Sequence, residues 1–299
     1  MRAVLLCLLL ALVLPTARAQ APATLQQAAQ AAPDLQYPRE SSTFSLFTSP
    51  EMALYKPEGT GPFPALVLMH QCGGLRNPRS NWQNLAVLQW AREGVAHGYV
   101  VLVVDSLGPR NAATVCLGPS NGVNFPRGVR DALMAGRHLA SLPYVDAQRI
   151  GVAGFSWGAM VSVLASSPSW AQPLAEDGFR FRAAAALYPG CFTVRPRDGR
   201  PYEILNPDID RPLLMLMGGQ DTETPAADCA SRLEAMPAAP VTRHLYPDAT
   251  HCWDCKNLNN FSKVDVRGSQ VVYHYSEETT HDSETRVFEF FARQMPPAR

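Results

Sequence analysis

Short apolar runs alternate with segments of helical periodicity over most of the chain. Runs that suit strands buried on both faces lie at residues 65–69, 99–104, 150–155, 183–188, 213–217 and 241–246. Apolar residues recur at helical spacing at residues 81–97, 127–142, 159–165, 226–236 and 282–295. Strands linked by helical crossovers predict an α/β fold, a mostly parallel sheet with helices on both faces.

Two segments depart from this alternation. Residues 44–55 have alternating apolar positions interrupted by Ser49-Pro50, which predict a short hairpin at a sheet edge. Residues 252–280 interrupt the pattern and are predicted to form an excursion over the sheet edge. The length suits one large core, so residues 41–299 are predicted to form a single domain. Ligands of such a sheet bind at the carboxyl ends of its strands.

The N-terminus has the pattern of a secretory signal peptide. Arg2 precedes an apolar run at residues 3–14, and the small-residue triplet Ala17-Arg18-Ala19 follows. The run is too short to span a bilayer comfortably, and the pattern predicts cleavage of residues 1–19 before Gln20. A buried or anchoring N-terminal helix is the alternative. The cleaved protein is predicted to be secreted or periplasmic, without stable membrane insertion.

Residues 20–40 are rich in Ala, Gln and Pro and lack a sustained apolar period, so we predict a flexible leader there. The chain has 26 Lys and Arg against 26 Asp and Glu. Removal of the signal peptide takes away only Arg2 and Arg18, which leaves a slightly negative charge. This balance gives no reason to expect a nucleic acid or an anionic membrane as a partner. We expect no metal or other cofactor.

The strongest chemical signal is the pentapeptide Gly154-Phe-Ser156-Trp-Gly158. It lies between a predicted strand and a predicted helix, which is the context that a G-x-S-x-G nucleophile motif requires. The sharp turn leaves no room for side chains at the two glycines, and it presents the serine oxygen beside the free N–H groups of the helix start. Alternatively, the serine merely caps the helix.

A serine nucleophile needs a base and an orienting acid, which follow in the order serine, acid, histidine in this motif's architecture. Asp221 follows the predicted strand at residues 213–217, and His251 follows the one at residues 241–246. Both therefore belong at the carboxyl edge, with Ser156. The alternatives are a helix-capping aspartate before Thr224-Pro225 and a structural loop histidine.

Three other residues could compete for these roles. Asp228 falls inside a predicted helix, Asp248 is only three residues from His251, and His281 lies beyond the irregular excursion. We rank all three below Asp221 and His251.

Acyl transfer also needs N–H donors for an oxyanion. Trp157, the residue after the serine, is one expected donor. The other is expected in the loop "HQCGG" after an early strand, where Gly73-Gly74 allow a tight fold and Cys72 or Gln71 supplies the N–H. His70 is predicted to be a buried histidine bonded to backbone.

Seven cysteines are present, of which Cys7 lies in the predicted signal peptide. The others are Cys72, Cys116, Cys191, Cys229, Cys252 and Cys255. An even number in an exported chain predicts up to three disulfides, although fifteen pairings are possible. Bridges from Cys72 to Cys116 and from Cys191 to Cys229 are plausible. The C-x-x-C spacing of the last pair fits a local disulfide, a redox site or part of a zinc site.

The segments "PALVLMHQCGG", "GYVVLVVDSLGPR", "RIGVAGFSWGA", "RPLLMLMGGQDTETP" and "YPDATH" occur in an order that resembles the dienelactone hydrolase branch of the α/β-hydrolase family. The resemblance covers most of the chain from about Phe63 to Arg293. It implies the three-layer α/β-hydrolase fold, Ser156, Asp221 and His251 as the triad, and Cys72 with Trp157 as oxyanion donors. Dienelactone hydrolases proper use a cysteine nucleophile, and related proteins tend to have glycine at position 71.

These features predict an exported serine hydrolase that cleaves small-molecule carboxylic esters or lactones through an acyl-enzyme on Ser156. The alternatives are a peptidase or an acyltransferase with the same triad, or a non-catalytic binding module that retains the fold.

Overall fold

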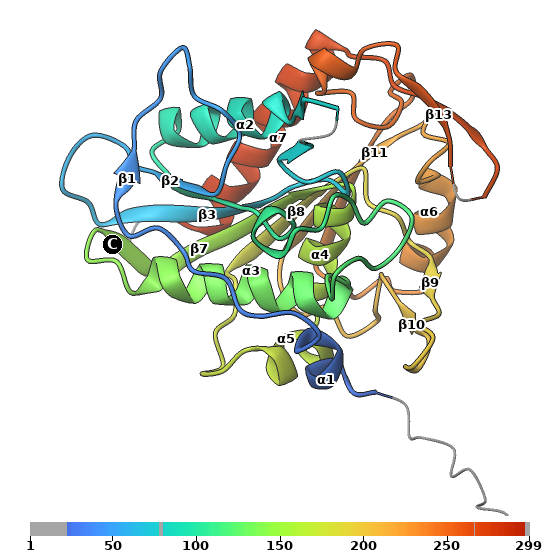
Figure 1. Ribbon diagram of the computed structural model, residues 1–299, viewed down its shortest axis with the longest axis horizontal. Helices are drawn as coiled ribbons and strands as arrows, with labels where there is room; N and C mark the ends of the chain where they lie inside the picture. The colour runs from blue at the N-terminus through green and yellow to red at the C-terminus, as the bar shows by residue number, and fades with distance from the viewer. Residues whose placement is uncertain (1–22, 78–79, 266, 297–299) are drawn as a thin grey trace, which may run out of the picture.

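The computed structural model describes residues 23–77, 80–265 and 267–296. Its centre is an eight-stranded sheet of order β1-β2-β6-β3-β7-β8-β11-β12 (Figure 1). The strands are β1 (Ser41–Ser42), β2 (Ala53–Tyr55), β3 (Phe63–Met69), β6 (Val100–Val104), β7 (Val145–Phe155), β8 (Ala183–Leu187), β11 (Leu213–Gly218) and β12 (Val241–Tyr246). Only β2 and β6 pair antiparallel in this sheet. The predicted mostly parallel sheet is confirmed.

Helices cover both faces of the sheet and complete three layers. They are α1 (Leu25–Ala29), α2 (Leu85–Ala96), α3 (Phe125–Ala140), α4 (Trp157–Ala165), α5 (Pro168–Leu174), α6 (Ala226–Glu234) and α7 (Glu277–Gln294). Helices α2 and α7 pack on one face, and the others contribute to the core on the opposite face (Figure 1). Among the described residues, no helix combines the length and apolar character that a membrane span requires.

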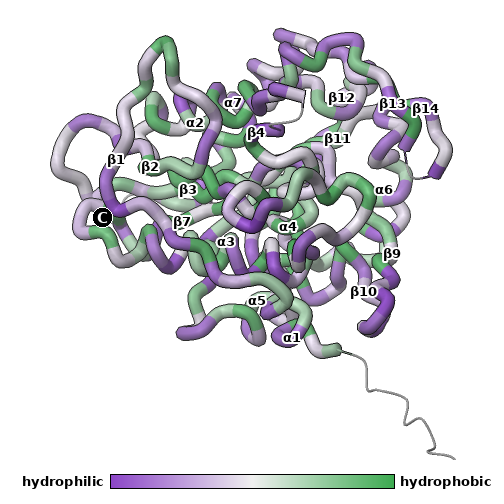
Figure 2. The backbone as a smooth tube through the Cα atoms, viewed as in Figure 1, coloured by the Kyte–Doolittle hydropathy of each residue, from purple (hydrophilic) through white to green (hydrophobic). Residues whose placement is uncertain are grey.

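The continuous apolar runs follow from this layering. Along β3, Ala65, Val67 and Met69 belong to one hydrophobic core, whereas Leu66 and Leu68 belong to the other. Both faces of the strand are therefore buried, as in other parallel sheets covered by helices. Figure 2 shows hydrophobic positions along the central strands and frequent hydrophilic positions at the periphery.

Smaller elements lie in the connections. Three short antiparallel pairs are β4 (Arg76–Asn77) with β5 (Trp82–Gln83), β9 (Thr193–Val194) with β10 (Tyr202–Glu203), and β13 (Ser262–Val264) with β14 (Gln270–Val272). Single 3₁₀ turns lie at Gly108–Arg110 and Lys256–Leu258. The β13–β14 hairpin occupies the irregular segment predicted at residues 252–280.

The hairpin predicted at residues 44–55 is wrong. Strand β2 does lie at the edge of the sheet, but its partner β1 precedes the predicted hairpin and runs parallel to it. The residues between them form a loop in which Leu46 and Phe47 are almost fully exposed. The alternating apolar positions do not indicate a strand here, because Leu46 and Phe47 face solvent rather than a core.

The flexible leader predicted at residues 20–40 is also wrong for its described part, residues 23–40. Helix α1 packs against α3 with Ala29 fully buried. Asn124 donates to the Ala28 carbonyl at 2.9 Å, and Arg127 donates to the Ala29 carbonyl at 2.9 Å. Hydrogen bonds to backbone carbonyls thus hold the segment against the domain. The apolar pattern of the sequence does not reveal such bonds. The signal peptide predicted at residues 1–19 lies outside the described residues.

A buried ionic cluster joins this segment to the domain. The Asp131 carboxylate on α3 accepts two hydrogen bonds from Arg110, at 2.7 and 2.8 Å, and one from Arg127 at 3.0 Å. All three side chains are at most 1 % exposed. Arg110 also donates to the Pro33 carbonyl at 2.6 Å. The cluster therefore connects α3, the loop after β6 and the N-terminal segment.

Three disulfides tie the loops at the carboxyl edge together. They join Cys72 to Cys116, Cys191 to Cys229 and Cys252 to Cys255. The first connects the loops after β3 and β6, and the second connects the loop after β8 to α6. The two longer bridges considered plausible from sequence are confirmed, and the C-x-x-C pair forms the local disulfide.

Candidate active site

Ser156 lies at the sharp turn between β7 and α4. Its backbone has φ 52° and ψ −110°, a conformation that is strained for a residue with a side chain. A Cβ on Gly154 would overlap the carbonyl of Gly158, and a Cβ on Gly158 would overlap the carbonyl of Met69. The two glycines of the motif are therefore required by close backbone packing, and the packing holds the serine in place.

The three residues predicted as a triad come together at the carboxyl edge of the sheet. Asp221 follows β11, His251 follows β12, and both are buried. Asp221 Oδ2 lies 2.7 Å from His251 Nδ1, and His251 Nε2 lies 2.9 Å from Ser156 Oγ. Since a carboxylate only accepts, Nδ1 donates to Asp221, which leaves Nε2 of the neutral ring to accept from the serine hydroxyl.

The competing residues do not reach this position. Asp228 and Asp248 are exposed, and the His281 side chain is 84 % exposed. Asp221 is held instead by its own loop, where the Glu223 and Thr224 amides donate to Oδ1 at 2.9 and 2.8 Å. The Thr224 hydroxyl donates to Oδ2 at 2.7 Å. These bonds lie within the loop, and α6 begins after Pro225 without a side-chain cap, so Asp221 does not cap this helix.

The charges around His251 favour the doubly protonated, cationic form of its imidazole. Burial lowers the pKa of His251, but the attraction of Asp221 and then of Glu223 outweighs it, and the net pKa is raised above 6.5. Burial raises the pKa of Asp221, but the charge of His251 and hydrogen bonds from Thr224 outweigh it and lower the net pKa. The pair is therefore arranged to stabilise an imidazolium beside a carboxylate.

These shifts predict the acid limb of a pH profile. A His251 that acts as a base must be neutral, and a raised pKa means that it stays protonated to a higher pH. The value of kcat/KM should therefore fall on acidification with a midpoint above pH 6.5. Initial rates with an uncharged ester across pH 5 to 9 measure it. A midpoint at or below pH 6.5 contradicts the electrostatic account.

The loop after β3 is joined to the start of α4, the helix that follows the serine. The Gly158 N–H donates to the His70 carbonyl at 3.1 Å, which joins this loop to the start of α4. Trp157 is the first residue of α4, so its N–H has no acceptor within the helix. Within the described residues, neither the Trp157 amide nor the Cys72 amide donates to a protein acceptor. Both amides therefore remain candidates for the oxyanion donors.

His70 has the structural position predicted for it. The Ser106 N–H donates to its Nε2 at 3.1 Å, so the ring proton is on Nδ1, which donates to the Gln71 carbonyl at 2.6 Å. The same carbonyl accepts from the Gly74 N–H at 3.0 Å. Because the C=O and N–H of a trans peptide point in opposite directions, these two bonds also orient the Cys72 N–H.

A buried polar network behind the site was missed by the sequence analysis. The Asp254 carboxylate accepts from Trp90 Nε1 and from the Tyr188 hydroxyl, each at 2.8 Å. Gln71 Nε2 donates to the Tyr188 hydroxyl at 3.2 Å, and Gln71 Oε1 accepts from Asn84. The Gln71 side chain therefore supports the loops behind the site. Burial raises the pKa of Asp254. Only the position of Asp254 inside the C-x-x-C segment marked it in the sequence.

The Cys252–Cys255 disulfide lies next to this network. Gln71 Nε2 is 3.8 Å from one sulfur and 3.6 Å from the other. Sulfur atoms of these cysteines and an oxygen of Asp254 are the group of potential metal-ligand atoms in the described part of the chain. Disulfide-bonded sulfurs are not thiolates, so this cluster does not have the donors of a zinc site.

A second carboxylate also lies beside His251. Glu223 Oε2 is 3.8 Å from His251 Nε2, the nitrogen that faces Ser156. The carboxylate is held by Lys263 and Tyr273, which lie in and just after the β13–β14 hairpin. Glu223 was not among the residues predicted from the sequence, although its position two residues after Asp221 places it in the same loop.

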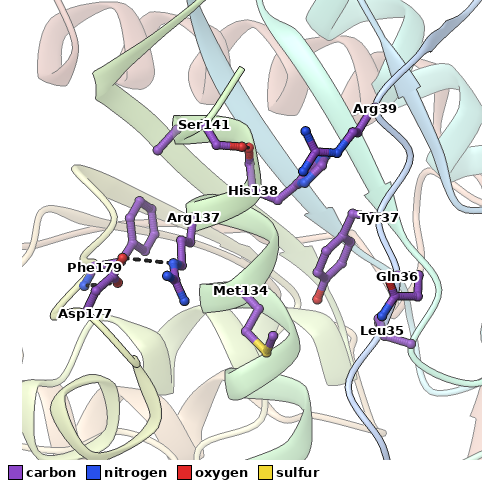
Figure 3. Close-up of a pocket in the computed structure, with 11 residues that line it drawn as sticks. Leu35, Gln36, Tyr37, Arg39, Met134, Arg137, His138, Ser141, Asp177 and Phe179 are labelled. Atoms are coloured by element: carbon purple, nitrogen blue, oxygen red, sulfur yellow. Dashed lines mark hydrogen bonds and ion pairs between the residues drawn. The ribbon is translucent and has the colours of Figure 1, made fainter. Parts of the chain in front are cut away.

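A surface pocket lies along the C-terminal half of α3, between the N-terminal segment and the residues that follow α5. Figure 3 shows Tyr37, His138 and Phe179 among its lining residues. His138 donates to the Pro38 carbonyl at 2.8 Å, and Arg137 pairs with Glu176 and Asp177. None of the three predicted triad residues lines this pocket. The pocket is separate from the candidate site.

Comparison with known proteins gives one family match and several relatives. The family described as the dienelactone hydrolase family matches residues 51–295. A Salmonella typhimurium protein with a provisional carboxymethylenebutenolidase name is 28% identical over 152 residues, which cover 50% of this chain and 47% of that protein. Esterase FrsA of Escherichia fergusonii is 30% identical over 115 residues, which cover 37% and 23%. The chain thus spans about half the length, or less, of these curated relatives.

Solved structures share the fold. The esterase Est2 of Thermogutta terrifontis has a TM-score of 0.58 and 14% identity, and the match covers 82% of this chain and 87% of Est2. The metagenomic α/β hydrolase MGS-M1 has a TM-score of 0.53 and 17% identity, with 79% and 86% covered. At these identities the likeness establishes the three-layer α/β-hydrolase fold.

Proposed function

This chain belongs to the dienelactone hydrolase family, and on that premise we propose that it is a serine hydrolase that cleaves carboxylic esters or lactones through an acyl-enzyme on Ser156. The observation that supports this proposal most is the chain of two hydrogen bonds from Asp221 through His251 to Ser156, at 2.7 and 2.9 Å. The family and the names of its curated relatives favour an ester or lactone bond as the target.

The positions of the three side chains support the following reaction. Ser156 Oγ attacks the substrate carbonyl while His251 Nε2 accepts its proton, and Asp221 stabilises the imidazolium. The oxyanion accepts hydrogen bonds from the Cys72 and Trp157 amides. The tetrahedral intermediate collapses, the bond to the alcohol breaks, and His251 returns the proton to the leaving oxygen. Water, activated by the same nitrogen, then releases the acid and the free serine.

A panel of activated aryl esters, lactones and aryl amides tests the proposal. Catalytic turnover of esters or lactones, with much slower cleavage of the amides, is the expected result. Amide cleavage that matches ester cleavage would instead favour a peptidase. A folded protein that turns over none of them would favour the binding module.

Export is a further part of the proposal, with residues 41–299 as one hydrolase domain. Three disulfides suit an oxidising compartment, and the predicted signal peptide would direct the chain there. The expected result is that the protein from a periplasmic or extracellular fraction begins at Gln20, as measured by N-terminal sequencing. A mature protein that retains residues 1–19 in the cytoplasmic fraction contradicts export.

A further inference from the structure

Glu223 is an acidic side chain that approaches the reacting nitrogen from outside the proposed triad. Its Oε2 lies 3.8 Å from His251 Nε2, which in turn lies 2.9 Å from Ser156 Oγ. The two oxygens are therefore separated by no more than the sum of these distances. Any acyl group bound to Ser156 must place its first few atoms within reach of the field of Glu223.

The carboxylate is fixed in this position. The Tyr273 hydroxyl donates to Oε2 at 2.6 Å, and Lys263 Nζ donates to Oε1 at 2.7 Å. Arg267 fixes the backbone of the loop that carries Glu223, because it donates to the Thr222 and Glu223 carbonyls at 2.8 and 2.7 Å. These contacts connect the β13–β14 hairpin and the residues flanking it to the loop that carries Asp221.

Glu223 also remains charged in this environment. Its side chain is 15 % exposed, so water screens it only in part. Burial raises the pKa of Glu223, but the charges of His251 and then Lys263 outweigh it and lower the net pKa. A desolvated negative charge beside the acyl position repels a second negative charge more strongly than it would in water.

We propose that Glu223 is a specificity-determining residue that selects esters with an uncharged or cationic acyl group over esters with a carboxylate near the scissile carbonyl. The inference rests on the proposed function. Lys263 pairs with the far oxygen of Glu223 and offsets part of its charge, whereas Oε2 is the oxygen nearest to His251. Removal of the Glu223 charge should therefore weaken the discrimination against anionic acyl groups, and removal of the Lys263 charge should strengthen it.

The test uses three aryl esters with the same leaving group. Their acyl groups are the neutral butyryl group, the anionic 3-carboxypropionyl group of succinate and the cationic 4-(trimethylammonio)butyryl group. Wild-type protein should have kcat/KM for butyrate roughly tenfold or more above that for the anionic ester, with the cationic ester close to butyrate. Glu223→Gln should reduce the butyrate-to-succinate ratio by roughly tenfold, and Lys263→Met should increase it several-fold.

Glu234→Gln is the matched control, because it removes an exposed carboxylate from the end of the following helix α6. It should leave the ratio within twofold of wild type. If Glu223→Gln folds poorly, the increase in Lys263→Met still tests the proposal. A protein that hydrolyses butyrate but keeps the same ratio in both site variants overturns the role of Glu223. A wild-type protein that hydrolyses none of the three esters overturns the proposed function itself.

Discussion

Replacement of Ser156 by Ala should lower kcat/KM for a small activated ester by roughly 10⁴-fold or more and leave the fold intact. The hydroxyl is the group that lies 2.9 Å from His251 Nε2 and that the proposed reaction acylates. Without it, neither His251 nor the oxyanion donors can form the covalent intermediate. Alanine is smaller than serine, so it introduces no new contact at the strained turn. Steady-state kinetics and circular dichroism measure the two effects.

Ser162→Ala is a suitable control for this variant. Ser162 is also buried in α4, and its hydroxyl donates to the Gly158 carbonyl at 3.1 Å. Its loss removes a hydroxyl of the same kind without touching the proposed triad, and activity should stay within a few-fold of wild type. Equal losses in the two variants would indicate a general effect of α4 rather than a nucleophilic role for Ser156.

The largest effect on stability is expected for Asp131→Asn. The change leaves the buried guanidinium groups of Arg110 and Arg127 without the negative charge that both contact. Breaking a buried pair in this way costs about 3 to 5 kcal/mol, because the remaining charge cannot return to water. The apparent Tm should fall by roughly 10 °C, and urea unfolding should give the matching loss of free energy.

Asp34→Asn provides the contrast. Asp34 also pairs with Arg127, at 2.8 Å, but its side chain is 39 % exposed. Arg127 keeps its buried bond to Asp131, and the side chain at position 34 remains in contact with water, so the expected cost is about 1 kcal/mol or less. If the two variants lose the same free energy of unfolding, burial does not determine how much each carboxylate of this cluster contributes to stability.

The layers of the fold could be predicted because burial on both faces imposes continuous apolar strands. The order of Ser156, Asp221 and His251 could be predicted because each follows a strand at the same edge. The packing of residues 23–40 could not, since it depends on backbone carbonyls that accept from Arg110, Asn124 and Arg127. Such contacts leave no periodic pattern in the sequence.

Side chains that join distant loops were also missed. Glu223 gains its position from Lys263 and Tyr273, some forty to fifty residues further along the chain. Asp254 is buried by contacts with Trp90 and Tyr188, which come from other parts of the sheet and its helices. A sequence identifies a carboxylate, but the partners that desolvate and orient it depend on the tertiary fold.

If Ser156 is a nucleophile activated by His251, an organophosphonate should label it covalently. Peptide mass spectrometry of the labelled protein should find one phosphonyl group per chain, attached to Ser156. Labelling should be slow or absent in the His251→Ala and Ser156→Ala variants. An unlabelled Ser156 in folded wild-type protein, or an adduct on another residue that persists in Ser156→Ala, would contradict a nucleophilic role for Ser156.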